Sequence, residues 1–232
     1  MIGRINLMKF SKKSKDGSKF VTDERINTIT HMAAACFAVL GAALLISQAS
    51  AQGQPWKIVA LSIYSLSIIC LFVFSALHHG VNGSSKLNEI FRTFDYNSVF
   101  LLIASTVTPI VLVLYFDVFG WAVLGAVWLI ASLGMTLRSI NRQLPRYITN
   151  TFYIVLGWMP IVLICANAIL PLGAILLLVL GGIVYSAGFT IYVIEKPNFK
   201  PGVFGFHELW HILVVVAALL HYLLIYFYVL PK

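Results

Sequence analysis

Charged residues are scarce in this sequence, and acidic residues are scarcer still. Asp, Glu, Lys and Arg together make up 10% of the 232 residues, and only eight residues are acidic. A soluble domain normally carries about 25% charged residues, whereas 60% of this chain is hydrophobic. A soluble core could not hide so much apolar surface, so the lack of charge excludes an ordinary soluble domain and indicates lipid as the solvent.

Cysteine is rare as well. Cys36, Cys70 and Cys165 lie far apart, each inside an apolar run. No two of them are spaced closely enough to suggest a disulfide pair, and no feature indicates a secreted protein. These observations exclude a disulfide framework and predict three reduced, buried packing residues. The first hydrophobic run also lacks the small-residue cleavage site of a signal peptide, so we interpret it as a retained membrane span.

Hydrophobic runs long enough to cross about 30 Å of hydrocarbon recur along the chain. We predict membrane spans at residues 27–47, 57–79, 94–115, 119–138, 147–167, 170–194 and 205–230. Pro109 and Pro160 lie inside predicted spans and should bend them, which membrane helices tolerate. The sequence therefore predicts an all-α protein with a seven-helix transmembrane domain at 26–232 and a basic N-terminal tail at 1–25.

The distribution of basic residues predicts the orientation of this bundle. Seven of the sixteen Lys and Arg precede residue 26, and seven more lie in the second, fourth and sixth connections. Only Lys57 and Lys232 fall on the opposite side. Because cytoplasmic segments are rich in Lys and Arg, the N-terminus should be cytoplasmic and the C-terminus outside. Beside a membrane domain, the tail is expected to bind anionic lipid headgroups rather than nucleic acid.

Ionisable side chains inside membrane helices are costly and usually functional. Ser75 and His79 should lie near the cytoplasmic end of the second span, and Asp95 near the start of the third. His207 and His211 should lie near the start of the seventh span, at the same face of the membrane. Three segments that are distant in sequence therefore bring polar groups to one depth, which predicts a functional site there.

The spacing of the histidines favours a metal ion. His207 and His211 are four residues apart, so on a helix they share one face, with Cβ atoms about 5–6 Å apart. Two imidazoles can then bind one ion, and His79 can supply a third nitrogen. Three protein ligands and a water molecule are typical of catalytic zinc, so we predict Zn²⁺ bound by His79, His207 and His211.

Asp95 and Ser75 are the predicted catalytic residues. Asp95 could accept a proton from zinc-bound water or orient a ligand, and Ser75 could donate a hydrogen bond to a developing oxyanion or hold a water molecule. Two structural roles compete with these. Asp95 could instead cap the N-terminus of the third span, and Ser75 could form an ordinary hydrogen bond between helices.

The other histidines carry weaker predictions. His78 points about 100° away from His79 on a helix, so we expect it to pack. His221 lies ten residues after His211, towards the outer half, and is expected to make a buried polar contact. His31, one turn into the first span, could lie beside the metal ligands or could face lipid headgroups.

Residues 207–211 also fit the H-E-x-x-H pattern of zinc proteases, in which the glutamate, here Glu208, is the general base. Such proteases need a third ligand, often an acidic residue in a later segment, but no Asp or Glu follows His211. The third ligand would have to come from earlier in the chain, with His79 as the best candidate. An intramembrane metalloprotease therefore stays open as an alternative.

Four segments together resemble one family. They are an S-x-x-x-H element at 75–79, an aspartate segment at 94–98 followed by Thr108 and Pro109, an H-x-x-x-H element at 207–211, and an N-terminal segment with Glu24, Asn27 and His31. In this order they are similar to the bacterial haemolysin III proteins of the progestin and adipoQ receptor family. The residues around Asp95 depart from those of many bacterial relatives, but the predicted ligands are untouched.

The resemblance implies a seven-helix protein of the bacterial cell membrane, with zinc bound by His79, His207 and His211 and with Asp95 and Ser75 near the zinc-bound water. Adiponectin receptors and alkaline ceramidases share this arrangement, so it implies a zinc-dependent hydrolase that takes lipid amides or esters from the bilayer. Two alternatives stay open. One is a non-enzymatic sensor of membrane homeostasis with structural zinc, and the other is a haemolytic, pore-forming cytolysin, which the lack of a long polar stripe disfavours.

Overall fold

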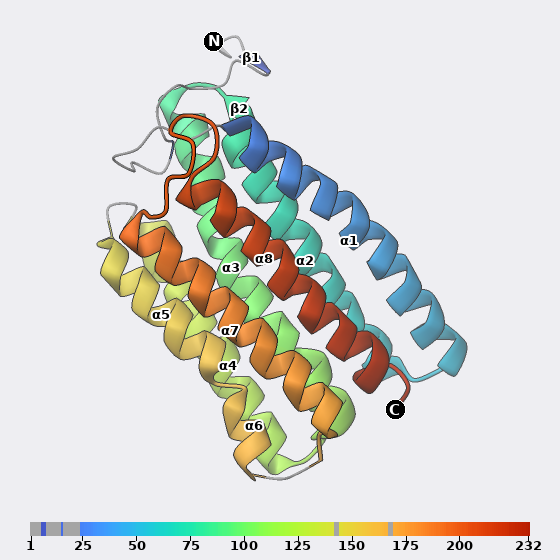
Figure 1. Cartoon of the computed structure of the whole chain (residues 1–232). Helices are drawn as coiled ribbons and strands as arrows, with labels where there is room; N and C mark the ends of the chain where they lie inside the picture. Colours follow the sequence, from blue (N-terminus) through green and yellow to red (C-terminus); the bar gives the residue numbers. More distant parts are fainter. Residues whose placement is uncertain (1–5, 8–14, 16–23, 142–143, 167–168) are drawn as a thin grey trace.

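The computed structural model describes residues 6–7, 15, 24–141, 144–166 and 169–232, which form a bundle of long, roughly parallel helices (Figure 1). In chain order the helices are α1 (Glu24–Gln52), α2 (Pro55–Gly80), α3 (Ser85–Leu114), α4 (Val118–Ile140), α5 (Arg146–Trp158), α6 (Ile161–Ala166), α7 (Leu172–Ile194), α8 (Phe206–Leu224) and the π-helical segment η1 (Ile225–Val229). Two short strands, β1 (Asn6–Leu7) and β2 (Val81–Asn82), pair antiparallel at one end of the bundle.

Seven stretches of the described chain are long and apolar enough to cross a membrane, which confirms the predicted all-α bundle with seven spans. The fifth stretch, Tyr147–Cys165, covers all but one residue of each of α5 and α6, and the seventh runs from α8 through η1. Pro160 lies between α5 and α6, as expected for a residue that has no N–H to donate within a helix. Pro109 stays inside α3.

The start of α3 differs from the prediction. The helix begins at Ser85 rather than at residue 94, because the Ser84 side chain accepts a hydrogen bond from the Leu87 backbone N–H at 3.3 Å and caps it. Asp95 therefore lies in the third turn of α3, and the alternative that it caps this helix is wrong. Hydropathy detects only the part of a helix that is apolar, so it missed the polar turns before residue 94.

The helices pack around α3, which contacts α2, α4, α5 and η1. Side chains such as Phe100 and Tyr115 are almost completely buried there. Peripheral helices instead keep large apolar side chains on their outer faces, for example Phe37 and Leu40 of α1. In a membrane protein these faces contact hydrocarbon, so the apolar surface needs no further cover.

The three cysteines follow the same division between interior and periphery. All three lie in described parts of the chain and are free, which confirms that they form no disulfide framework. The prediction that all are buried is wrong: Cys36 and Cys165 are exposed and Cys70 is half-buried. An apolar run in a membrane helix has a lipid-facing side as well as a buried side, and sequence hydrophobicity does not distinguish the two.

One residue of the N-terminal tail lies against the end of α2. The Lys15 ammonium group donates hydrogen bonds to the backbone carbonyls of His78, His79 and Val81, at 2.9, 3.1 and 2.6 Å. A cation is favourable at the C-terminal end of a helix, where carbonyls have no partner within the helix. Most of the basic tail, at 1–5, 8–14 and 16–23, lies outside the described residues, so its binding to anionic headgroups stays a prediction.

Candidate metal centre

Three histidines from two helices meet at the end of the bundle where α1 and α8 begin. His79 lies in the last turn of α2, and His207 and His211 lie in the first two turns of α8. One ring nitrogen from each lies within 4.8 Å of the others, and all three side chains are buried. Chain segments more than a hundred residues apart thus form one compact group of nitrogens, as the sequence predicted.

The spacing within this group suits a metal ion. The Nε2 atoms of His207 and His211 are 3.1 Å apart. Two nitrogens that each bind a tetrahedral Zn²⁺ at 2.0–2.1 Å would be about 3.3 Å apart. Because imidazole nitrogens are also preferred ligands of zinc, the residues present fit this ion.

Glu24 fixes the orientation of His79. It is the first residue of α1, is 1% exposed, and its Oε2 atom accepts a hydrogen bond from His79 Nδ1. The opposite ring nitrogen, Nε2, is then the atom available to a metal. A carboxylate that accepts a hydrogen bond from the second nitrogen of a ligand histidine is the usual partner in zinc sites.

The sequence predicts no role for Glu24, apart from its place in the N-terminal segment that resembles the family. Its second carboxylate oxygen, Oε1, accepts a hydrogen bond from the Lys15 backbone N–H at 3.1 Å. A signal was nevertheless present, because Glu24 is an acidic residue at the start of a span, at the predicted depth of the histidines. What could not be read from the sequence is the lateral packing of α1 on α2 that joins Glu24 to His79.

His31 also belongs to the interior of the site. It is 3% exposed and its ring stacks on that of His211, with centroids 3.9 Å apart and an interplanar angle of 28°. Phe72 of α2 contacts the same ring edge-on at 5.2 Å. Of the two positions left open by the sequence, the structure places His31 beside a predicted ligand and not at the headgroups.

Asp95 and Ser75 lie beside the three histidines. Asp95 is half-buried in α3, and one of its carboxylate oxygens lies within 4.8 Å of ring nitrogens of His78 and His79. Ser75 is buried one turn before His79 on α2. His78 is buried, as expected for a packing residue, but it also belongs to the group around Asp95, which the sequence did not predict.

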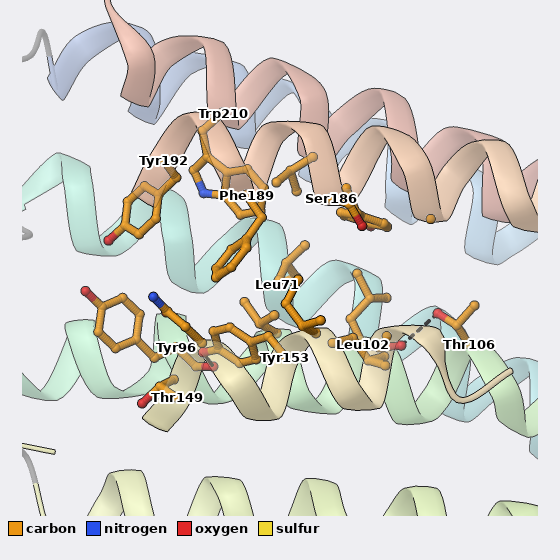
Figure 2. A pocket seen from close by; sticks show the side chains of 18 of the residues that line it. Leu71, Tyr96, Leu102, Thr106, Thr149, Tyr153, Ser186, Phe189, Tyr192 and Trp210 are labelled. Carbon is orange, nitrogen blue, oxygen red and sulfur yellow. Dashed lines mark hydrogen bonds between the residues drawn. The ribbon is translucent and has the colours of Figure 1, made fainter. Parts of the chain in front are cut away.

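A cavity of about 400 Å³ opens from this cluster into the bundle between α2, α3, α5, α7 and α8. Ser75, Asp95 and the three clustered histidines line one part of it, and apolar side chains form most of the remaining wall. Figure 2 shows two facing walls, with Leu71 between them. Tyr96, Thr149 and Tyr153 lie on one, and Phe189, Tyr192 and Trp210 on the other.

Over residues 20–222, the sequence matches the profile of a family described as Haemolysin-III related. The chain belongs to the haemolysin III family. The match includes all four segments on which the resemblance was based, from Glu24 to His211.

The sequences of individual relatives agree with this membership. Hemolysin-3 of Bacillus cereus is 32% identical over 220 residues, which cover 92% of this chain and 95% of that protein. The Hemolysin-3 homolog of Bacillus subtilis (strain 168) is 29% identical and covers 90% of this chain. The human Monocyte to macrophage differentiation factor is 22% identical over 87% of it. With seven stretches of its described residues long and apolar enough to cross a membrane, the chain is a multi-pass protein of the bacterial cell membrane.

Glu208 has a structural contact in this haemolysin III protein. Its Oε2 atom accepts a hydrogen bond from the Gly205 backbone N–H at 2.7 Å, which caps the start of α8. The side chain is fully buried and is not among the described residues that line the cavity. Its carboxylate is therefore directed to the helix terminus, although its two histidine neighbours line the cavity.

His221 lies deeper in the same cavity. Its Nε2 atom is 3.2 Å from the carbonyl oxygen of Leu178 on α7, which confirms the expected polar contact, although the His221 side chain is half-buried rather than buried. His221 and the histidine cluster therefore line one continuous space, although they do not belong to one metal-binding group.

Proposed function

We propose that this haemolysin III protein is a membrane-embedded, zinc-dependent hydrolase of lipid amides or esters. One observation carries the proposal: three histidines, Asp95 and Ser75 line the polar end of a cavity whose other walls are mostly apolar. An apolar cavity with a few convergent polar groups is the common form of a ligand site. Here the polar end suits a carbonyl group, and the apolar walls suit a hydrocarbon chain.

His79, His207 and His211 would hold the ion, and Glu24 would keep His79 turned towards it. When bound, zinc supplies Lewis acidity and lowers the pKa of a bound water molecule to about 7. Because tetrahedral zinc takes four ligands, the three histidines would leave one position open for water or substrate.

Asp95 and Ser75 would act on the reacting groups. Asp95, as general base, would accept a proton from the attacking water and then return it to the leaving amine or alcohol. The Ser75 hydroxyl would donate a hydrogen bond to the carbonyl oxygen as negative charge develops there. Both residues line the cavity that His79 also lines, and this shared lining supports their action on a carbonyl group that enters from the cavity.

The lipid chain would occupy the apolar part of the cavity. Leu71, Leu102 and Phe189 are among its walls, and burial of a hydrocarbon chain there would stabilise the complex by about 25 cal/mol per Å² of apolar surface. The same walls exclude bulk water from the polar end, which strengthens the electrostatic interactions made by Asp95 and Ser75.

The metalloprotease alternative fits the structure less well. It requires Glu208 as the general base, but this carboxylate caps α8 and does not line the described cavity. Asp95, which is half-buried on another helix, has a carboxylate that does line this cavity. The geometry thus supports Asp95 as the base.

The test is release of fatty acid by purified protein in lipid nanodiscs loaded with zinc, with a panel of lipid amides and esters. We expect Asp95→Asn to lower the rate by about 10²–10⁴-fold, because general base catalysis contributes that much, while bound metal is retained. Asp117→Asn is the matched control, since Asp117 caps α4 by accepting from Gly120 N–H, and asparagine caps equally well.

Two results would contradict the proposal. One is metal-loaded wild-type protein that releases no fatty acid from any lipid tested, which would favour the non-enzymatic sensor with structural zinc. The other is an Asp95→Asn variant with an unchanged rate of release, because the base would then be another group.

A further inference from the structure

A second polar cluster lies in the cavity, away from the candidate metal centre. It contains His221 of α8, Tyr185 and Ser186 of α7, and Trp158 of α5, all of which line the cavity. His221 follows His211 by ten residues of one helix, which separates them by about 15 Å along its axis. We call these four residues the deep polar cluster.

The position of His221 depends on a glycine. A Cβ atom added to Gly181 would lie 2.3 Å from His221 Nε2, so only glycine leaves room for the ring beside α7. The Nε2 atom lies 3.2 Å from the Leu178 carbonyl oxygen, and Tyr185 packs against the ring with centroids 5.6 Å apart. Because a carbonyl only accepts hydrogen bonds, Nε2 carries the proton and Nδ1 is left as an acceptor.

The hydroxyl groups of the cluster have capacity to bind a ligand. The Tyr185 hydroxyl oxygen is buried and has no hydrogen-bond partner among the described residues. Trp158 Nε1 donates to Ser186 Oγ at 3.1 Å, so the serine hydroxyl still has its own proton to donate. On the facing wall, Thr106 donates to the Leu102 carbonyl at 2.7 Å, the bond drawn in Figure 2. The available groups therefore belong to the side formed by α7 and α8.

An unpaired polar group among hydrocarbon is unfavourable, so such groups within a membrane protein usually serve a ligand or a pathway. The bond from His221 to Leu178 could serve helix packing alone. That role does not explain why the neighbouring Tyr185 hydroxyl is held at the same cavity without a partner among the described residues.

We propose that the deep polar cluster binds a hydroxyl group in the middle of a lipid chain whose carbonyl end lies at the histidines. A hydroxyl can accept a hydrogen bond from Tyr185 and donate one to His221 Nδ1, which a plain hydrocarbon chain cannot do. The direction of the chain rests on the proposed hydrolase function. The ligand class is therefore an acyl lipid, or its free fatty acid, with a mid-chain hydroxyl.

The test compares binding of two free fatty acids of equal length, one with a mid-chain hydroxyl and one without, to purified zinc-loaded protein in detergent by titration calorimetry. We expect roughly tenfold tighter binding of the hydroxy acid, the effect of about one net hydrogen bond. Tyr185→Phe should abolish this preference. Tyr147→Phe, at an exposed position of α5, should keep the preference.

The outcomes separate this inference from the proposed function. Equal affinity of wild-type protein for the two acids would overturn the hydroxyl site, even if fatty-acid release depends on Asp95. A preference that survives in Tyr185→Phe would overturn its assignment to the deep polar cluster. A preference lost in Tyr185→Phe would support the site even if no hydrolysis is found, because binding is measured without turnover.

Discussion

Glu24 links the start of α1 to the candidate metal centre, and its charge matters as well as its shape. Its carboxylate accepts a hydrogen bond from His79 Nδ1 in a buried environment, where such a contact is strong. Glu24→Gln keeps the size but removes the charge, so we expect zinc to bind about 10–100-fold more weakly. Competition with a chelator measures this affinity. Glu89→Gln, which removes a partly exposed ion pair with Arg92, is the control, and equal affinity in both variants would argue against the role of Glu24.

His211 provides a second test at the residue scale. It shares the metal group with His79 and His207 and also stacks on His31. His211→Ala removes one of three nitrogens, and we expect the purified variant to contain little bound metal. His221→Asn, on the same helix but outside the group, should retain the wild-type content. Metal analysis of both proteins gives the answer, and zinc retained in His211→Ala would show that the ion is held elsewhere.

At the scale of elements, the end of α2 depends on a residue outside the bundle. Lys15 donates to three carbonyls at this terminus, one of them that of His79 itself. Lys15→Met keeps the long side chain but removes the donor, and we expect a loss of about 1–2 kcal/mol in stability. Thermal unfolding in detergent measures it, with Lys86→Met at an exposed position of α3 as the control. Equal melting temperatures in the two variants would mean that Lys15 does not stabilise α2.

The same elements show which parts of the site could be predicted from the sequence. His207 and His211 were predictable because their spacing is local to one helix, and His79 because its span ends at the same depth. The contact between Glu24 and His79 depends instead on how α1 packs against α2, which hydrophobicity does not encode. The early start of α3 was missed for a related reason, since its first turns are polar although they are helical.

At the scale of the whole molecule, the bundle has two unlike ends. The histidine cluster, Asp95 and Lys15 lie at the end where α1 and α8 begin, and η1 ends at the other (Figure 1). The charge distribution predicts that the histidine end is cytoplasmic. Substrate would then meet the polar groups on the inner side of the membrane, while the deep polar cluster would lie further towards the outside.

Cysteine labelling tests this orientation. In a background of Cys36→Ala, Cys70→Ala and Cys165→Ala, single cysteines are placed at exposed positions on opposite ends, Ser85→Cys beside the histidines and Gln54→Cys between α1 and α2. We expect a membrane-impermeant maleimide to label Gln54→Cys in intact cells, and Ser85→Cys only after permeabilisation, because fourteen of the sixteen basic residues lie on the predicted inner side. The opposite pattern would place the histidines at the outer face, and the hydrolase would then draw its lipids from the outer leaflet.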